Sequence, residues 1–347
     1  MKFLKTLTSF IQKYRKNYLA VAGFAFIVVC VFISILGYLI TPDQSPSCNE
    51  MNLQLGLKPP GMMATFVEPL VEESNQNFIA TMLYGKERST PTFLWNSVGD
   101  TSLVQVTQYQ LDKSTSTPEI KTQTRRYFLG TDVFGRDVWS RVLLGTRVSL
   151  SVGLISVLIS LVLGLFFGLC AGYYRGWVDK AIMWLINVIW SLPTLLLVIA
   201  ITFALGKGFW QIFVAVGLTM WVELARIVRG QVFSLREQEF VQAAGMLGYS
   251  DVRIMIKHIL PNLLGPIVVI CAANFASAIL LEAGLSFLGL GVQPPLPSWG
   301  QMLNENYAYI AFNKVHLALA PGIAIMLLVM SFNFVGNGLR DALDVKL

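Results

Sequence analysis

The sequence predicts an all-α membrane protein with six transmembrane helices. Hydrophobic residues make up 54% of the 347 residues and charged residues only 13%, whereas soluble domains carry about 25% charged residues. Apolar runs long enough to cross a bilayer recur along the chain. Lysine and arginine collect in short segments between alternate runs, which explains the net charge of +6 as a topology signal. A nucleic-acid-binding protein would instead concentrate its basic residues in one patch.

The first predicted helix covers residues 18–40 and follows a cytoplasmic N-terminal segment, residues 1–17. That segment contains lysine and arginine but no acidic residue, and the helix itself carries no charge. The apolar run is too long for a signal peptide and lacks a small-residue cleavage site. We therefore expect a membrane span with its N-terminus in the cytosol.

Residues 41–127 change in character and are expected to form an extracytoplasmic insertion of uncertain structure. Proline, serine, glutamine and threonine become frequent. Residues 104–107 alternate like a strand, and Phe78–Leu83 is a short apolar run. A small folded insertion and an extended arm both fit, and a surface extension is favoured over a receptor module. Cys48 is the one cysteine in a polar segment, so we expect a thiol reagent to reach it.

The segment from residue 128 to 147 carries charges that alternate in sign along a helical spacing. This pattern favours a salt-bridged helix lying at the outer surface over a segment that contacts substrate. Its charged residues are Asp132, Arg136, Asp137, Arg141 and Arg147.

Five further spans complete the prediction. They cover residues 148–174, 181–205, 209–226, 262–290 and 315–339. Glycine and serine in the first of these five allow close helix packing, and Pro193 should kink the next one. The span from 209 is short or continues past Glu223 and Arg226. Six spans put both termini in the cytosol, and the short inward segments are the ones rich in arginine and lysine.

A polar stretch, residues 236–261, separates two of these spans. Apolar side chains recur in it at helical spacing, and Gly248 then stands where a helix end needs positive φ. Ser250 and Asp251 have the character of a second helix start, and Pro261 is placed where that helix would end. The stretch is therefore predicted to be helix, glycine hinge, helix, with the small pair Ala243–Ala244 open to another protein.

This stretch resembles the cytoplasmic EAA coupling loop of ABC importer permeases. The residues in register with that motif are Gln242, Ala243, Ala244, Gly248, Leu260 and Pro261. Gln242 replaces the usual glutamate and His258 the usual isoleucine, and neither change removes the hinge. On this resemblance, coupling to an ATPase is assigned to Phe240, Gln242, Ala243, Ala244, Leu247, Gly248 and Pro261.

Three more motifs resemble the second, C-type permease of oligopeptide and dipeptide importers. The first is an outer-surface motif made of Gly130, Thr131, Asp132, Gly135, Arg136 and Asp137. The other two are Leu281–Gly291 and Pro297–Gly300. The resemblance covers the first span and the core from residue 128 to 347, but not most of the insertion.

The resemblance implies the type I ABC importer permease fold in a bacterial cytoplasmic (inner) membrane. It implies a second homologous permease, one or two ABC ATPase subunits, an extracytoplasmic substrate-binding protein and a peptide substrate, all within membrane lipid. ATP and Mg would be used by the partner ATPases. Nickel or another small solute is the alternative cargo. A stand-alone secondary transporter is less favoured, because the sequence has no obvious repeat.

No pattern in the sequence indicates catalysis. The phosphate-binding pattern GxxxxGK[ST] is absent, so this chain is not expected to hydrolyse ATP. The two histidines fall on opposite membrane sides in the predicted topology, which argues against a metal site. We therefore expect a non-catalytic subunit that binds no cofactor, no metal and no nucleic acid.

Glu282 is the residue that says most about a possible translocation path, because it interrupts a long uncharged run. A carboxylate inside a membrane is costly unless it has a partner, is hydrated or is protonated. It either lines the translocation path and meets a cationic part of the substrate, or pairs with a neighbouring helix. Asn274 is a weaker candidate of the same kind.

Overall fold

The computed structural model describes residues 12–69, 77–86, 93–95, 120–206 and 208–343. The strand-like pattern at residues 104–107 and the last four residues lie outside this part of the chain. The described residues belong to two compact units. The helical unit comprises Met1–Cys30, Ser149–Gln293 and Ile323–Leu347, and the mixed unit comprises Val31–Val148 and Pro294–Gly322.

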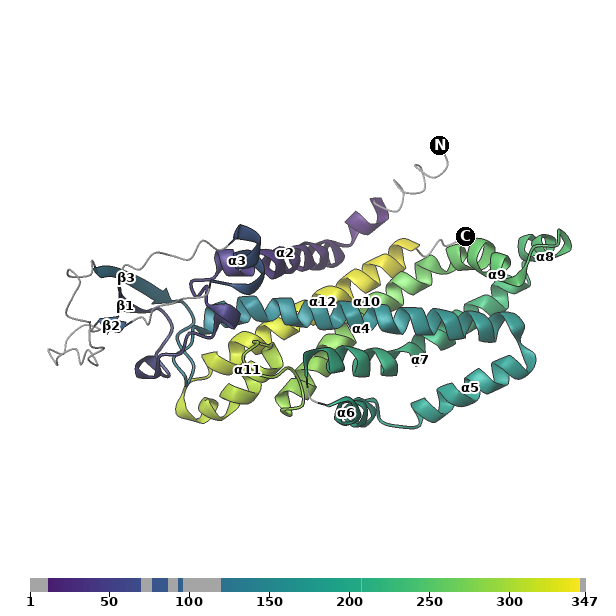
Figure 1. Ribbon diagram of the computed structural model, residues 1–347. Coiled ribbons are helices and arrows are strands. Elements are labelled where there is room, and N and C mark those ends of the chain that lie inside the picture. The colour runs from purple at the N-terminus through teal and green to yellow at the C-terminus, as the bar shows by residue number, and fades with distance from the viewer. Residues whose placement is uncertain (1–11, 70–76, 87–92, 96–119, 207, 344–347) are drawn as a thin grey trace. The chain divides into compact units, whose positions relative to one another are not determined.

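Long helices dominate the chain (Figure 1). They are α2 (Tyr18–Ile40), α4 (Val138–Tyr174), α5 (Gly176–Trp190), α6 (Thr194–Leu205), α7 (Phe209–Arg236), α10 (Leu260–Phe287) and α12 (His316–Leu343). The short elements α8 (Glu239–Met246), α9 (Asp251–Ile254) and the π-helical η3 (Met255–Ile259) lie between α7 and α10. Among the described residues, five helical runs are apolar and long enough to cross a membrane, and α5 with α6 makes a sixth if the pair counts as one broken span.

Several helix boundaries differ from the expected ones. Helix α5 begins at Gly176 rather than at 181, and α12 ends at Leu343 rather than at 339. Helix α2 coincides with residues 18–40, but α4 begins at Val138 rather than at 148. Helix α7 is the longer of the two alternatives and ends at Arg236. Pro193 breaks the third span instead of kinking it, since α5 and α6 meet at 92° and Pro193 is the N-cap of α6. A proline ring clashes with the preceding helical turn and offers no N–H, so the chain starts a new helix there.

The second helix of the coupling stretch does not end at Pro261, which corrects the prediction. Helical structure runs without interruption from Asp251 to Phe287 through α9, η3 and α10. Pro261 lies inside this continuous helix, directly after η3. The wider π-helical turn before it makes room for the ring.

Glycines set the distance between α4 and α7 in the helical unit. Gly164, Gly168 and Gly172 recur every fourth residue on α4 and meet Leu224, Val228 and Val232 of α7. A Cβ on Gly168 would lie 2.7 Å from Val228 Cβ, and one on Gly172 would lie 2.6 Å from Val232 Cβ. The two backbones are therefore as close as glycine allows, as expected for small-residue packing in membranes.

The mixed unit contains a three-stranded antiparallel sheet in the order β2–β1–β3. Strand β1 (Met62–Pro69) pairs with β3 (Ile120–Tyr127) from Met62↔Tyr127 to Pro69↔Ile120, and with the short β2 (Phe93–Trp95). The described part of the insertion is thus folded rather than an extended arm. Its small core contains Leu55, Ala64, Phe66 and Tyr127.

Short helices complete the mixed unit. They are η1 (Pro46–Cys48), η2 (Leu53–Leu55), α3 (Phe78–Tyr84), α11 (Trp299–Asn306) and η4 (Tyr307–Phe312). Arg147 donates hydrogen bonds to the Ser34 carbonyl at 2.8 Å and the Leu83 carbonyl at 2.7 Å, which ties the end of α2 to the end of α3. Cys48 is fully buried, and its Sγ donates to the Asp43 carbonyl at 3.1 Å. The expectation that a thiol reagent reaches Cys48 is therefore wrong.

Candidate functional site

The first helix of the coupling stretch and its glycine hinge have the expected local geometry. Helix α8 ends at Met246 with Leu247 as its C-cap, and Gly248 follows with φ of 76°. The Tyr249 N–H donates to the Ala244 carbonyl and the Gly248 N–H to the Gly245 carbonyl, so the helix end closes in the manner of a glycine-terminated helix. Gln242, where the motif has glutamate, donates from Nε2 to the Glu237 carbonyl at 3.1 Å.

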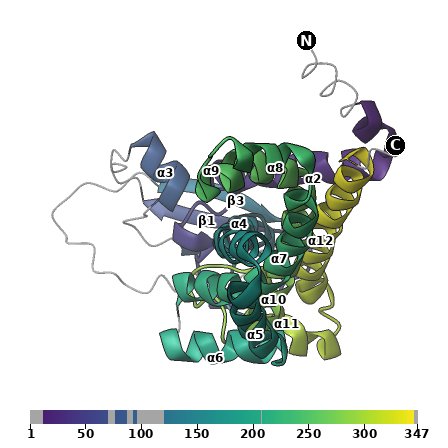
Figure 2. The same ribbon diagram turned by 90° about the vertical axis from the view of Figure 1, so that its right-hand side faces the viewer.

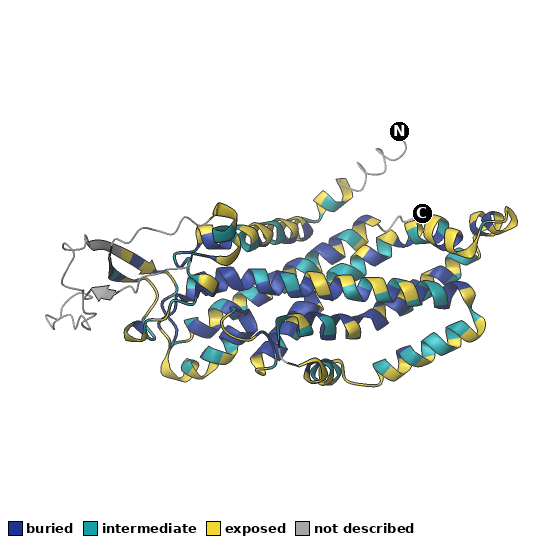
Figure 3. Ribbon diagram, viewed as in Figure 1, coloured by how far each residue is buried: buried dark blue, intermediate teal, exposed yellow. Residues whose placement is uncertain are grey.

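The two faces of α8 differ in what they contact. Val241 and Ala244 point into the core of the helical unit and are buried. Phe240, Gln242 and Ala243 are exposed, as are Met246 at 86% and Leu247 at 72%. Figures 2 and 3 show α8 beside α9 at one end of the helical unit and as a mixture of buried and exposed residues. Ala244 is therefore not part of an open small-residue face, which corrects the prediction for that residue.

Sequence reasoning missed three of the exposed apolar residues in this region: Met246, Val252 and Ile256. Their spacing on α8, α9 and η3 was visible, but the apolar pattern alone does not say which face is turned inward. We name the exposed apolar set Phe240, Met246, Leu247, Val252 and Ile256 the coupling surface.

A single hydrophobic core anchors the coupling stretch. Besides Val241 and Ala244 it contains Ile254 of α9, Leu224, Val228 and Val232 of α7, and Leu263 and Ile267 of α10. The Tyr173 hydroxyl adds a polar link by donating to Asp251 at 2.9 Å. Displacement of α8 must therefore displace α7 and α10, because close-packed cores transmit strain.

The motif from Gly130 to Asp137 forms a buried turn in the mixed unit rather than a surface helix. Arg136 donates from Nε to Asp132 at 2.6 Å and from Nη2 to Glu305 of α11 at 2.5 Å. Thr131 donates to the Leu55 carbonyl, and Gly130 and Gly135 adopt φ of 73° and 75°. Asp132, Arg136, Asp137 and Arg141 are buried, so the alternating charges mark an internal network and not a solvated face.

Asp137 is the N-terminal cap of α4. Its carboxylate accepts from the Trp139 N–H, the Ser140 N–H and the Ser140 hydroxyl. Burial raises the pKa of Asp137 to about 6, and nearby Asp43 acts in the same direction. Burial also raises the pKa of Asp43 itself.

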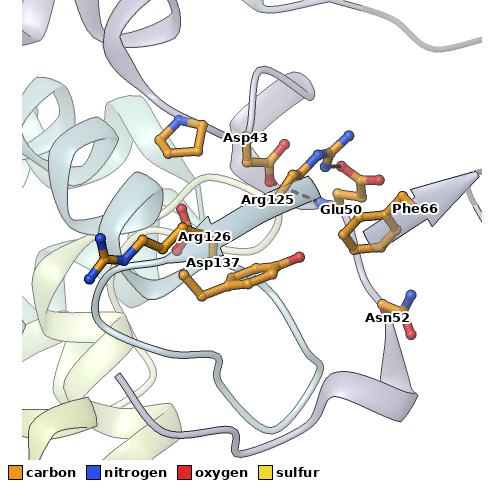
Figure 4. A pocket seen from close by; sticks show the side chains of 9 residues that line it. Asp43, Glu50, Asn52, Phe66, Arg125, Arg126 and Asp137 are labelled. Atoms are coloured by element: carbon orange, nitrogen blue, oxygen red, sulfur yellow. Dashed lines mark hydrogen bonds and ion pairs between the residues drawn. The ribbon is translucent and has the colours of Figure 1, made fainter. Parts of the chain in front are cut away.

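A small pocket of about 10 Å³ lies beside Asp137. Figure 4 shows Arg125 next to Glu50 and Phe66, while Arg126 extends to the other side of the strand. Arg125 pairs with Glu50 at 2.6 Å and its guanidinium lies 4.9 Å from the centroid of the Phe66 ring. The volume holds about one water molecule, so this is a packing defect and not a ligand site.

The Pro297–Gly300 motif fixes α11 against the start of α4. Ser298 caps α11 by accepting from the Gln301 N–H at 3.1 Å. Trp299 is buried and donates from Nε1 to the Val142 carbonyl at 2.8 Å. A Cβ on Gly145 would lie 2.8 Å from the Trp299 ring, so this glycine makes room for the indole.

Glu282 is fully buried five residues before the end of α10. Its Oε1 accepts from the Ser286 hydroxyl at 2.7 Å, and Ser286 Oγ in turn accepts from the Val292 N–H. The residue therefore takes part in closing the C-terminal end of α10. Asn274 is buried nearer the middle of α10, and within the described residues its Nδ2 has no hydrogen-bond partner.

The helical unit contains a cavity of about 350 Å³. It is lined by Ile189 and Trp190 of α5, Thr194 and Leu197 of α6, Thr219, Met220 and Glu223 of α7, and Ser277, Leu280 and Leu281 of α10. Neither Glu282 nor Asn274 is among these lining residues. Glu223 is the only ionisable residue among those that line the cavity. The sequence could have pointed to it in the same way as to Glu282, because both are carboxylates within apolar helices.

Comparison with known proteins gives consistent matches. Residues 144–347 match the model of the family described as binding-protein-dependent transport system inner membrane component, and residues 7–60 match the N-terminal TM domain of oligopeptide transport permease C. The chain is 43% identical to the glutathione transport system permease protein GsiD of Pectobacterium atrosepticum, over 64% of this chain and 73% of that protein. It is 42% identical to the dipeptide transport system permease protein DppC of Alkalihalophilus pseudofirmus, over 64% and 72%.

A solved structure of the MetNI methionine ABC transporter in an inward-facing conformation aligns with a TM-score of 0.48 and 20% identity, covering 57% of this chain and 93% of the other. The family matches confirm the assignment made from the four motifs to the oligopeptide and dipeptide permease branch. This chain belongs to the family of inner membrane components of binding-protein-dependent transport systems.

Proposed function

We propose that this chain is the permease subunit of an ATP-driven importer of peptides, and that it forms the translocation path with a second homologous permease. The carrying observation is the coupling surface, an exposed apolar set on short helices whose buried faces share one core with α7 and α10. Exposed apolar patches of this kind mark protein docking sites. The relatives named for glutathione and dipeptide transport support a peptide cargo.

In this proposal two ATPase subunits, of one or two kinds, dock beneath the permease pair. One of them docks on the coupling surface of this chain and the other on the second permease, and an extracytoplasmic binding protein delivers the peptide. ATP and Mg are used by the ATPases, so the chain itself binds no cofactor and catalyses no reaction. Closure of the ATPases pushes α8, and the shared core passes that movement to α7 and α10. Those two helices also line the 350 Å³ cavity, so its access can change with the nucleotide state.

The decisive experiment purifies the chain from its native membrane and reconstitutes the complex in proteoliposomes. We expect a second permease and ABC ATPases to co-purify, and peptide uptake to require ATP and the loaded binding protein. Uptake of nickel but not of peptides would keep the proposed machinery and make nickel, not a peptide, the transported substrate. Uptake driven by an ion gradient without ATP would overturn the proposal in favour of a secondary transporter.

The proposal also places both termini in the cytosol and the mixed unit outside. Leu53, at 76% exposure, offers a test that the buried Cys48 cannot. In the variant Leu53→Cys, a membrane-impermeant thiol reagent should label intact spheroplasts strongly, while the wild-type chain gives the background. Labelling that appears only after lysis would contradict this topology.

A further inference from the structure

We propose that Glu223 is the substrate-contacting acid of the translocation path and binds the amino-terminal ammonium group of the transported peptide. This inference rests on the proposed function, because it assigns a role within the path that function requires. It starts from the cavity between the broken span α5–α6 and the helices α7 and α10. At about 350 Å³ the cavity has the size of small-ligand sites in proteins.

The lining of the cavity is apolar except for a few polar groups. Thr194, Thr219 and Ser277 supply hydroxyls, although Thr219 already donates to the Val216 carbonyl at 2.8 Å. Glu223 supplies the single charge, and its side chain is exposed rather than packed away. A carboxylate in a membrane-spanning helix is costly unless it meets a partner or water, so an exposed one facing a cavity is suited to a cationic occupant.

The neighbouring arginine does not neutralise this charge. Arg226 follows Glu223 by one helical turn, yet its guanidinium lies over the ring of Trp190, 3.9 Å from the centroid. Within the described residues Glu223 forms no ion pair with Arg226 or with any other group. Arg226 instead holds Trp190, a wall of the cavity, in place through a cation–π contact.

Glu223 is also mechanically connected to the coupling surface. Leu224, the next residue, belongs to the core that contains Val241 and Ala244 of α8. Movement of α8 therefore moves the segment of α7 that carries the carboxylate. If this movement changes the burial or hydration of Glu223, the carboxylate binds the ammonium group in one conformation of the transporter and releases it in the other.

Glu282, by contrast, is occupied within its own helix by Ser286 and is not among the cavity-lining residues. Of the two carboxylates, Glu223 is thus the one placed to meet a substrate. Glu282 is a positioning residue for the end of α10.

The test compares two cargos that the wild-type reconstituted complex carries, a dipeptide with a free amine and its N-acetylated counterpart. We expect Glu223→Gln to lower uptake of the free dipeptide about tenfold, the effect of one charge-assisted hydrogen bond, and to leave uptake of the acetylated peptide within about twofold. Glu223→Asp keeps the charge and should restore part of the loss. Asp341→Asn, which removes an exposed carboxylate at the end of α12, is the matched control and should change neither cargo.

The outcomes separate this inference from the proposed function. Absence of ATP-dependent peptide uptake by the wild-type complex would reject the proposed function itself. Normal wild-type uptake with equal loss of both cargos in Glu223→Gln, or loss of the companion subunits from that variant, would overturn the inference and make Glu223 a structural or lipid-facing residue.

Discussion

The buried turn, residues 130–137, and the glycine hinge of the coupling stretch use the same backbone conformation for opposite purposes. Gly135 has φ of 75° and Gly248 has φ of 76°. A Cβ on Gly135 would overlap the backbone of Asn52, whereas one on Gly248 would meet nothing within 4 Å. The first glycine is required by its neighbours and the second only by its own dihedral angles. Gly135 therefore allows close packing of two backbone segments, whereas Gly248 allows the chain to turn between α8 and α9.

The largest expected effect is at the buried turn. Gly135→Ala combines left-handed strain with a backbone collision, so we expect a loss of about 3 kcal/mol or more in stability. Gly61 has φ of 82° and open space around it, so Gly61→Ala carries the strain alone, about 1–2 kcal/mol. Thermal unfolding of the purified protein in detergent measures both. Equal shifts in Tm would mean that the close approach to Asn52 does not matter.

Gly248→Val should have a smaller effect on stability and a large one on coupling. The left-handed conformation strains a β-branched residue by about 1–3 kcal/mol, which the helical unit tolerates because no neighbour is displaced. We expect normal membrane levels but ATP hydrolysis that the loaded binding protein no longer stimulates. Gly248→Asn, which tolerates positive φ, is the control. Normal stimulation in Gly248→Val would show that the hinge is not needed for coupling.

The two regions also allow a comparison of exposed apolar side chains. Met246 lies on the coupling surface, and Leu53 in the mixed unit is exposed to a similar degree. We expect Met246→Glu to weaken ATPase association about tenfold, because a charge replaces a desolvated contact, and Leu53→Glu to have no effect on it. Association is measured by co-purification at graded detergent and salt. Similar behaviour of the two variants would indicate that docking occurs elsewhere on the chain.

The smallest expected effect is the pH dependence of the buried turn. Because the pKa of Asp137 in the folded protein is raised to about 6, the folded state holds its proton more tightly than the unfolded state. Its contribution to stability is greatest below about pH 4 and is lost as the pH rises through about 6. Asparagine also caps helices, so Asp137→Asn should reduce the loss of unfolding free energy between pH 5 and 7 by on the order of 1 kcal/mol. The Tm measured at each pH in that range tests this. An unchanged profile would exclude Asp137 as the titrating group.

The parts of the fold that depend on local signals were predicted well from the sequence. The charge-free run at residues 18–40 became α2, and Gly248 adopts the positive φ expected of it. The early start of α4 could not be predicted in the same way. The sequence pattern suggested that Arg136 and Arg147 were surface charges. Arg136 is buried and Arg147 half-buried, and both use partners remote in the sequence, Glu305 for Arg136 and the carbonyls of Ser34 and Leu83 for Arg147.

In the candidate site, too, local features could be predicted from the sequence, whereas features that depend on remote residues could not. The position of the coupling stretch followed from its motif, but the inward direction of Ala244 depends on the core built by α7 and α10. Pro261 looked like a helix end because the π-helical turn that accommodates it is not visible as a residue pattern. The cavity beside Glu223 exists because α5 and α6 meet at 92°, and the angle of a break cannot be read from one proline.

The glycines that bring α4 and α7 together also have a genetic consequence. Any base change in a glycine codon that alters the residue adds a Cβ atom, and at Gly164, Gly168 and Gly172 that atom would meet a side chain or a carbonyl of α7. Every single substitution at these three positions is therefore expected to disturb the packing of α4 against α7. Truncation of the facing residue does not help, because Val228→Ala would still leave the Cβ that lies 2.7 Å from a Cβ on Gly168. A side chain on this face of α4 therefore requires the two helix backbones to move apart.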